Sequence, residues 1–258
     1  ALLSLAKRMK FLQSGFAGMD APILQDVLKI ENVHIANASS VYAIPIAHYV
    51  FSQILRWNKR IDHHIEYQQS KNWAPIAGDG ELTNKTLVIL GYGGIGSQVA
   101  KLGKAFGMRV TGIRRNPQDD EHADEVLGLD RFEELLPLTD YLVLSLPDSL
   151  QTRDIINADI LEKLSNSAMI INVGRGTAIN EEDLSDALNG EKIAAAALDT
   201  TKVEPLDASS SLWTAKNCFI SAHDSAHSLL SLERAFELFF QNIKNIKNGD
   251  QIVNLYSE

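Results

Sequence analysis

The sequence predicts an α/β protein with a doubly wound parallel sheet and a second, smaller domain made from both chain ends. Three observations lead to this fold class. From Thr86 onward, short apolar segments alternate with helical patterns, as in βαβ units that cover a sheet on both faces. Most of these segments are apolar throughout, as strands buried on both faces are. The two ends of the chain instead carry long amphipathic patterns.

In the sheet domain, β-rich segments and helical patterns follow one another in a regular order. The expected strands are 86–90, 109–113, 141–146, 168–173, 193–198 and 218–221. The helices expected between them are 96–106, 132–136, 158–164 and 181–188. The pair Asn189-Gly190 provides the stop expected at the end of the last helix.

The flanking segments differ from this alternation. Residues 43–70 and 229–247 each repeat apolar side chains every three or four positions, which predicts long amphipathic helices. Short strand-like pieces occur at 9–13 and 33–35. We therefore expect a sheet domain over 44–227 and a smaller domain from 1–43 with 228–258. The chain begins at Ala1 and not at Met, so we expect an N-terminal part of the smaller domain to be missing.

The composition restricts the classes of function that the chain can have. Its 258 residues are 45% hydrophobic and 22% charged, as in soluble globular proteins. The net charge of −9 argues against nucleic-acid binding, which requires a basic face. The longest apolar run, 193–198, is far shorter than the roughly 20 residues that span a bilayer. The single cysteine, Cys218, excludes a disulfide framework and predicts a cytoplasmic protein.

A glycine-rich segment, Gly91-Tyr92-Gly93-Gly94-Ile95-Gly96, joins the first expected strand of the sheet domain to a helix. In this context Gly91 permits a tight turn, Gly93 lets backbone amides approach a pyrophosphate, and Gly96 lets the helix pack on the strand. The helix N-terminus then offers free N–H groups to phosphates. A connecting turn without a ligand is the alternative. The context favours a dinucleotide.

The end of the next strand predicts which dinucleotide is bound. An NAD site places Asp or Glu about 20 residues after the glycines, where it binds the ribose hydroxyls. No acid occurs between Gly96 and Gln118, and the strand is followed by Arg114 and Arg115. Guanidinium groups fit a 2′-phosphate, although a solvated basic corner would have the same sequence. We expect NADP, with NAD the less favoured cofactor.

Four polar residues follow later strands at the edge where ligands bind in open parallel sheets. Arg175 lies in a Gly-Arg-Gly triplet, Asp199 ends one strand, Glu204 follows five residues later, and His223 ends the next strand. Each alone is more often a surface or capping residue. Together they place a guanidinium that can bind an anion, two carboxylates and an imidazole at one edge of the sheet.

With these motifs the chain resembles the D-isomer-specific 2-hydroxyacid dehydrogenase family, over about residues 11–254. The matching pieces are Gly91-Tyr92-Gly93-Gly94-Ile95-Gly96, Leu146-Pro147-Asp148-Ser149-Leu150-Gln151-Thr152-Arg153, Ile171-Asn172-Val173-Gly174-Arg175-Gly176, Leu198-Asp199 with Glu204-Pro205, and Ser221-Ala222-His223. One departure is Ala222, where the family usually has proline before the histidine. The resemblance implies a Rossmann fold and a smaller substrate domain.

The resemblance also implies roles for individual residues. Arg175 would hold the substrate carboxylate and carbonyl, His223 would exchange the proton, and Glu204 would pair with His223. Asp199 would contact the nicotinamide carboxamide. Further cofactor contacts are implied for Gly94, Ile95, Pro147, Thr152, Val173 and Gly174. Ala17 and Gly18 resemble the loop whose amides receive the substrate carboxylate.

From these residues we expect an enzyme that transfers a hydride between NADP(H) and a small 2-oxo or D-2-hydroxy acid, of the glyoxylate, pyruvate or hydroxypyruvate type. A phosphoglycerate-type dehydrogenase and a non-catalytic nucleotide-sensing module are the alternatives. No residues have metal-ligand spacing, and no membrane or nucleic-acid partner is expected. The stripe with Tyr49, Phe51 and Trp57 is wider than one packing partner needs, and the resemblance implies a homodimer through the nucleotide-binding domain with 43–70 at its centre.

Overall fold

The protein consists of two compact units. The computed structural model describes residues 9–19, 28–30, 32–76 and 80–256. Unit 1 comprises Ala1–Pro45 and Ala226–Glu258, and unit 2 comprises Ile46–Ser225. The boundary between them falls inside the helix α3 (Ser39–Asn58), at its internal Pro45. The assignment of a substrate-binding role to the smaller unit stays a prediction.

Unit 2 contains a parallel sheet whose seven strands, among the described residues, have the order β5-β4-β3-β6-β7-β8-β9. The strands are β3 (Thr86–Leu90), β4 (Arg109–Ile113), β5 (Glu125–Leu127), β6 (Tyr141–Leu144), β7 (Met169–Asn172), β8 (Ala195–Leu198) and β9 (Cys218–Ile220). The strand order reverses direction between β3 and β6, which places a ligand crevice at the carboxyl ends of these strands. The predicted doubly wound α/β fold is confirmed.

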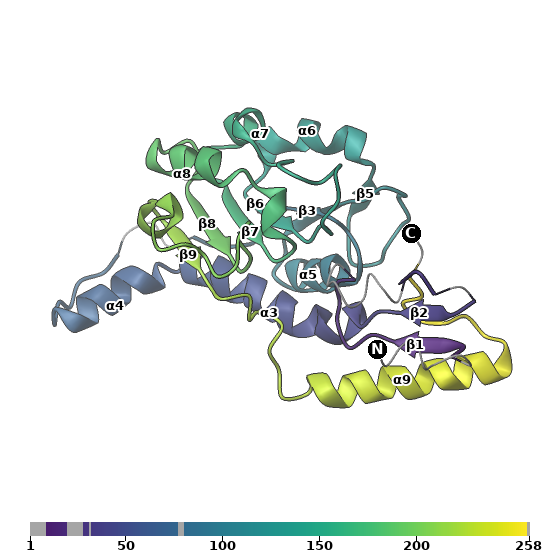
Figure 1. Ribbon diagram of the computed structural model, residues 1–258. Coiled ribbons are helices and arrows are strands. Elements are labelled where there is room, and N and C mark those ends of the chain that lie inside the picture. Colours follow the sequence, from purple (N-terminus) through teal and green to yellow (C-terminus); the bar gives the residue numbers. More distant parts are fainter. Residues whose placement is uncertain (1–8, 20–27, 31, 77–79, 257–258) are drawn as a thin grey trace. The chain divides into compact units, whose positions relative to one another are not determined.

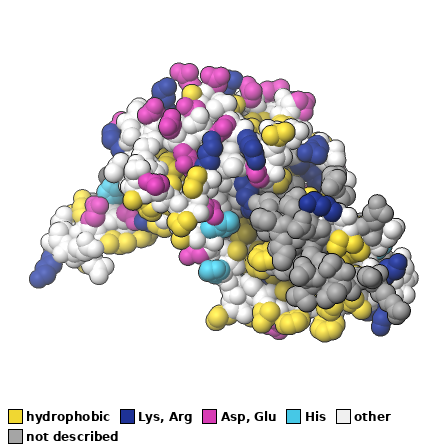
Figure 2. Space-filling view, viewed as in Figure 1, with side chains coloured by type: hydrophobic (Ala, Val, Ile, Leu, Met, Phe, Trp, Pro, Cys, Tyr) yellow, Lys and Arg dark blue, Asp and Glu magenta, His cyan; other side chains and the backbone are white. Residues whose placement is uncertain are grey.

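Helices cover both faces of this sheet (Figure 1). They are α5 (Gly94–Ala105), α6 (Phe132–Leu135), α7 (Ala158–Lys163) and α8 (Glu181–Asn189), with the 3₁₀ segments η1 (Leu129–Arg131), η2 (Leu136–Leu138), η3 (Gly176–Ala178) and η4 (Ser211–Thr214). In Figure 1, α6, α7 and α8 lie on one face, and α5 lies on the other with the unit 2 half of α3. Figure 2 shows acidic side chains gathered over α6–α8.

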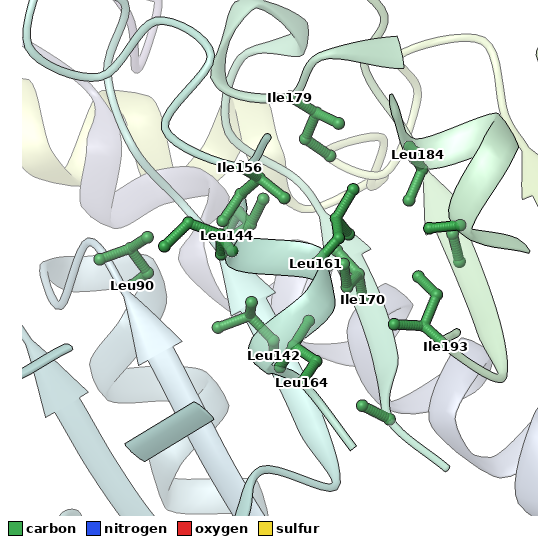
Figure 3. Packing of buried hydrophobic residues seen from close by; sticks show 14 of the residues in the cluster. Leu90, Leu142, Leu144, Ile156, Leu161, Leu164, Ile170, Ile179, Leu184 and Ile193 are labelled. Atoms are coloured by element: carbon green, nitrogen blue, oxygen red, sulfur yellow. The ribbon is translucent and has the colours of Figure 1, made fainter. Parts of the chain in front are cut away.

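The core explains why the strands are apolar throughout. On the face of α7 and α8, Leu142, Leu144 and Ile170 from the strands pack against Leu161 and Leu184 from the helices (Figure 3). The alternate positions of β3 point to the other face, where a Cβ atom on Gly103 of α5 would lie 2.8 Å from Leu87. Both faces of the sheet therefore exclude water, which is why the central strands are almost entirely apolar.

Two features of unit 2 differ from the sequence-based expectation. The edge strand β5 was not predicted, because it is short, lies in an acidic stretch and buries only Val126. The single helix expected over 43–70 is divided into α3 and α4 (Ile61–Gln69). Arg60 causes the division, because its φ of 52° is left-handed and cannot continue an α-helix.

Unit 1 joins the two ends of the chain. Its strands β1 (Phe11–Gln13) and β2 (His34–Ala36) pair in parallel, and its helix is α9 (Ser231–Asn248). The buried Asn242 of α9 donates hydrogen bonds to Gln13 (2.9 Å) and to the carbonyl of Val253 (3.1 Å). Along α9 a row of hydrophobic side chains is exposed (Figure 2). Among the described residues, no helix is long and apolar enough to cross a lipid bilayer.

Candidate active site

The glycine-rich loop has the geometry that a bound pyrophosphate requires. Gly91 has a φ of +98°, and a Cβ atom there would lie 2.8 Å from the backbone of Ser145, so glycine is needed at this turn. At Gly93 and Gly94 an added Cβ would meet nothing within 4 Å. At Gly96 it would lie 3.1 Å from the Ile89 side chain, which explains the close packing of α5 on β3. Gly91 and Gly96 are thus closely packed, whereas Gly93 and Gly94 face open space.

The two arginines after β4 differ in their surroundings. Arg114 is half-buried beside Tyr92, whereas Arg115 is exposed. In the described part of the chain, neither guanidinium makes a hydrogen bond or an ion pair. Each is therefore available to an anion at the open side of the glycine loop. The half-buried Arg114 is the better placed of the two, because partial burial strengthens a charge–charge contact.

One acid that the sequence argument did not count lies at this loop. Asp120 accepts a hydrogen bond from Ser97 in the first turns of α5 (3.0 Å) and another from the backbone N–H of His122 (2.8 Å). Partial burial raises the pKa of Asp120, but these bonds outweigh it and hold the pKa below its ordinary value. The chain after the strand turns back on the loop, a long-range contact that the spacing of acids along the sequence does not reveal.

Two further loops line the carboxyl ends of β6 and β7. After β6, Thr152 donates to the carbonyl of Pro147 (2.7 Å), and Arg153 binds Asp148 through two nitrogens, each at 3.0 Å. Thr177 also donates to Asp148 (2.9 Å), which ties this loop to the turn after β7. The Arg153 hydrogen bonds hold the pKa of Asp148 below its usual range. Asp148 therefore stays a carboxylate that fixes both loops.

The Gly-Arg-Gly turn brings Arg175 to the segment that carries Glu204. Gly174 fits against Ser145 and Leu146, where an added Cβ would approach backbone atoms to 2.7 Å. Gly176 lies directly on the backbone of Thr201, at 1.9 Å for an added Cβ. Buried Asn172 holds the turn, since it accepts from the Gly174 N–H and donates to the Arg175 carbonyl, both at 3.1 Å. Only glycines allow this packing, which leaves Arg175 half-buried between the loops.

The structure pairs His223 with Glu204. The Nδ1 atom of His223 lies 2.8 Å from Oε2 of Glu204, and about half of each side chain is exposed. The other carboxylate oxygen of Glu204 accepts from the backbone N–H of Thr201 (3.2 Å). The imidazole is therefore oriented by a carboxylate that is itself anchored to the turn under Arg175. Its Nε2 atom is the one left for a substrate.

Asp199, at the end of β8, is almost completely buried. Its carboxylate accepts from the hydroxyl of Ser221 (2.6 Å) and from the backbone N–H groups of Asp224 (3.0 Å) and Ser225 (3.2 Å). Its carbonyl accepts from the His223 N–H (2.8 Å). Asp199 is thus the support of the turn that carries the histidine. A contact with a nicotinamide carboxamide stays a prediction.

A cavity of about 500 Å³ opens beside the pair. Its polar wall includes Thr201, Glu204 and His223, and its apolar wall includes Leu206 and Trp213. The cavity borders the imidazole, but neither Arg175 nor the glycine loop is among the described residues that line it. The expected substrate loop with Ala17 and Gly18 belongs to unit 1, and its role stays a prediction.

The chain is similar to known proteins over nearly its whole length. A model of the D-isomer specific 2-hydroxyacid dehydrogenase NAD binding domain matches residues 51–225. The glyoxylate reductase of Aeropyrum pernix is 30% identical, over 98% of this chain and 78% of that protein. The human glyoxylate reductase/hydroxypyruvate reductase is 31% identical, over 83% of this chain and 67% of the human one.

Solved structures agree with these relatives. The NADPH-dependent glyoxylate/hydroxypyruvate reductase of Sinorhizobium meliloti, in complex with NADP and sulfate, superposes with a TM-score of 0.84 at 26% identity. The match covers 99% of this chain and 81% of that structure. The chain therefore belongs to the D-isomer-specific 2-hydroxyacid dehydrogenase family. The resemblance seen in its sequence motifs is confirmed.

Proposed function

We propose that the protein is an NADP(H)-dependent oxidoreductase that reduces small 2-oxo acids to D-2-hydroxy acids, and that it also runs in reverse. The observation that carries the proposal is the pair of His223 and Glu204, 2.8 Å apart, at the sheet edge that also holds the glycine loop. A nucleotide-sensing module would have no need of an oriented imidazole. The relatives from Aeropyrum pernix, human and Sinorhizobium meliloti are all described as reductases of glyoxylate or hydroxypyruvate.

The cofactor site has a fitting shape and charge. When bound, the reduced nicotinamide supplies the hydride for the carbonyl carbon of the substrate. The open side of Gly93 and Gly94 would hold the pyrophosphate at the N-terminus of α5, where N–H groups and the helix dipole favour anions. Arg114 and Arg115 supply positive charge for a 2′-phosphate. The Sinorhizobium meliloti relative carries NADP, which supports the same choice here.

His223 supplies the proton that the reduced carbonyl oxygen requires. With Nδ1 bound to Glu204, the Nε2 atom donates to the oxygen as negative charge develops on it. Glu204 stabilises the imidazolium before transfer and keeps the ring in one orientation. Arg175 binds the substrate carboxylate with two parallel N–H bonds and so positions the carbonyl beside the histidine. In the reverse reaction the same imidazole accepts the proton.

A panel of substrates tests the proposal. Oxidation of NADPH is followed with glyoxylate, pyruvate, hydroxypyruvate and phosphohydroxypyruvate, and the product of hydroxypyruvate is analysed for its configuration. We expect turnover with at least one of the three unphosphorylated acids and a D product. Turnover confined to the phosphorylated acid would instead identify a phosphoglycerate-type enzyme. Tight NADPH binding without turnover of any acid would identify a nucleotide-sensing module.

The homodimer and the cytoplasmic location belong to the same proposal. Phe51 and Tyr49 do not support the dimer as expected, because Phe51 stacks on Phe106 and Tyr49 bonds to Ser221 within the unit. Exposed apolar residues do support it: no residue of α4 is buried, and Trp73 after this helix is fully exposed. A second copy covering α4 would remove this surface from water. The single thiol of Cys218 suits a reducing compartment.

A further inference from the structure

A chain of hydrogen bonds runs from helix α3 to the turn that carries His223. The hydroxyl of Tyr49 lies 2.7 Å from Oγ of Ser221, and Oγ of Ser221 lies 2.6 Å from a carboxylate oxygen of Asp199. All three residues are at least partly buried. These hydrogen bonds therefore connect α3 to the carboxyl ends of β9 and β8, all within unit 2.

The direction of the bonds follows from the chemistry of the groups. The carboxylate of Asp199 can only accept, so the single hydroxyl proton of Ser221 must be donated to it. Ser221 is then an acceptor toward Tyr49, and the phenol is the donor. Burial is the main cause that raises the pKa of Tyr49 to about 12, so the phenol keeps its proton near neutral pH. Each bond polarises the next in such a chain.

Asp199, the last acceptor in this series of hydrogen bonds, holds His223 in an unfavourable backbone conformation. His223 has a φ of 54°, a left-handed value that costs free energy for a residue other than glycine. The conformation is maintained by the His223 N–H bond to the Asp199 carbonyl and by the Asp224 and Ser225 N–H bonds to its carboxylate. A carboxylate free to rotate would release two of these three bonds.

We propose that Tyr49 and Ser221 are positioning residues for the proton donor, because they fix the Asp199 carboxylate and through it the turn of His223. Ser221 also lines the cavity beside His223, whereas Tyr49 does not, so Tyr49 gives the cleaner test. The inference deepens the proposed function and rests on it. Its consequence is that loss of the Tyr49 hydroxyl lowers kcat.

Tyr49→Phe is the direct test, since it removes one oxygen atom and leaves the helix anchored. The stack of Phe51 on Phe106 (5.2 Å) and the contact of Arg56 with the Phe219 ring (3.9 Å) hold α3 in place independently. Tyr141→Phe is the matched control. Its buried hydroxyl also bonds to α3, accepting from Asn58 (2.9 Å), but it lies at the start of β6, away from the histidine.

We expect kcat to fall about 3- to 10-fold in Tyr49→Phe, as the loss of one buried hydrogen bond predicts. In Tyr141→Phe, kcat should stay within twofold of the parent (about the error of such comparisons), even if its melting temperature falls equally. Ser221→Ala should match Tyr49→Phe, and the double variant should be no slower than Ser221→Ala. Ser221→Thr, which keeps the hydroxyl, should restore turnover. Equal kcat in Tyr49→Phe and Tyr141→Phe would overturn the proposal.

Hydrogen–deuterium exchange separates this inference from the proposed function. The amides of His223, Asp224 and Ser225 should exchange faster in Tyr49→Phe by a similar factor, and at the parental rate in Tyr141→Phe. If no 2-oxo acid is turned over even by the parent, the proposed function fails. The exchange rates alone then test whether the Tyr49–Ser221–Asp199 hydrogen bonds fix the turn of His223. Unchanged exchange at all three amides in Tyr49→Phe would then overturn the inference.

Discussion

Arg114 is the single residue on which the choice of cofactor depends most. One charge-assisted bond to a 2′-phosphate contributes about 1.5–3 kcal/mol, so the parent should favour NADPH over NADH by roughly 10- to 100-fold in kcat/KM. Arg114→Asp should abolish or reverse this preference, because it places a negative charge beside the phosphate. Steady-state kinetics with both cofactors measures the ratio.

The control for that variant lies on β4, the strand that Arg114 follows. Arg109→Asp makes the same change of charge at the opposite end of β4, where the guanidinium is exposed and 3.5 Å from Thr86. It should leave the NADPH to NADH ratio unchanged. Equal use of the two cofactors by the parent would show that Arg114 is only a solvated residue at a strand end.

Single residues also show how far the sequence leads toward the site. His223, Glu204 and Arg175 could be proposed from the sequence because each follows a strand, and parallel strands end at one edge. Asp120 and Tyr49 could not, because their partners Ser97 and Ser221 lie on other elements. Contacts between elements depend on how the chain turns after a strand or enters a helix, which no local pattern encodes.

At the scale of elements, the junction of β3 and α5 separates a binding role from a packing role within one loop. Gly93→Ala should leave the melting temperature unchanged, because the backbone there is extended and an added Cβ meets no atom within 4 Å. It should weaken NADPH binding about tenfold or more, since the methyl group would stand where the pyrophosphate approaches the amides. Scanning calorimetry gives the melting temperature, and titration calorimetry gives the affinity for NADPH.

Gly96→Ala is the matched variant in the same loop. Its Cβ would lie 3.1 Å from Ile89, and overpacking of this kind costs about 1 kcal/mol or more, or roughly 2–4 °C in melting temperature. If Gly93→Ala bound NADPH like the parent, the loop would be a connecting turn and the cofactor site would lie elsewhere.

Elements with a continuous apolar pattern were also the ones that the sequence located best. The expected strands 86–90 and 109–113 coincide with β3 and β4. The edge strand β5 was missed because only one of its residues is buried. The division between α3 and α4 was missed because Arg60 is not a residue type that normally adopts a left-handed conformation.

At the scale of the whole molecule, the exposed residues of α4 predict self-association. Light scattering at micromolar concentration should give twice the mass of the chain. Ile61→Glu with Ile65→Glu should give the mass of one chain, because both side chains are exposed on a helix without buried residues. Leu138→Glu, at an even more exposed position elsewhere in unit 2, is the control and should remain dimeric. A parent with the mass of one chain would remove the dimer from the proposal.

The central claim is that His223, oriented by Glu204, donates the proton in an NADPH-dependent reduction. The most direct measurement is kcat of His223→Ala with NADPH and the best 2-oxo acid of the panel, beside His34→Ala as a control at an exposed histidine of β2. Loss of a general acid predicts a decrease of at least about 100-fold in His223→Ala and none in His34→Ala. Turnover close to that of the parent in His223→Ala would contradict the account, since another group would then have to supply the proton.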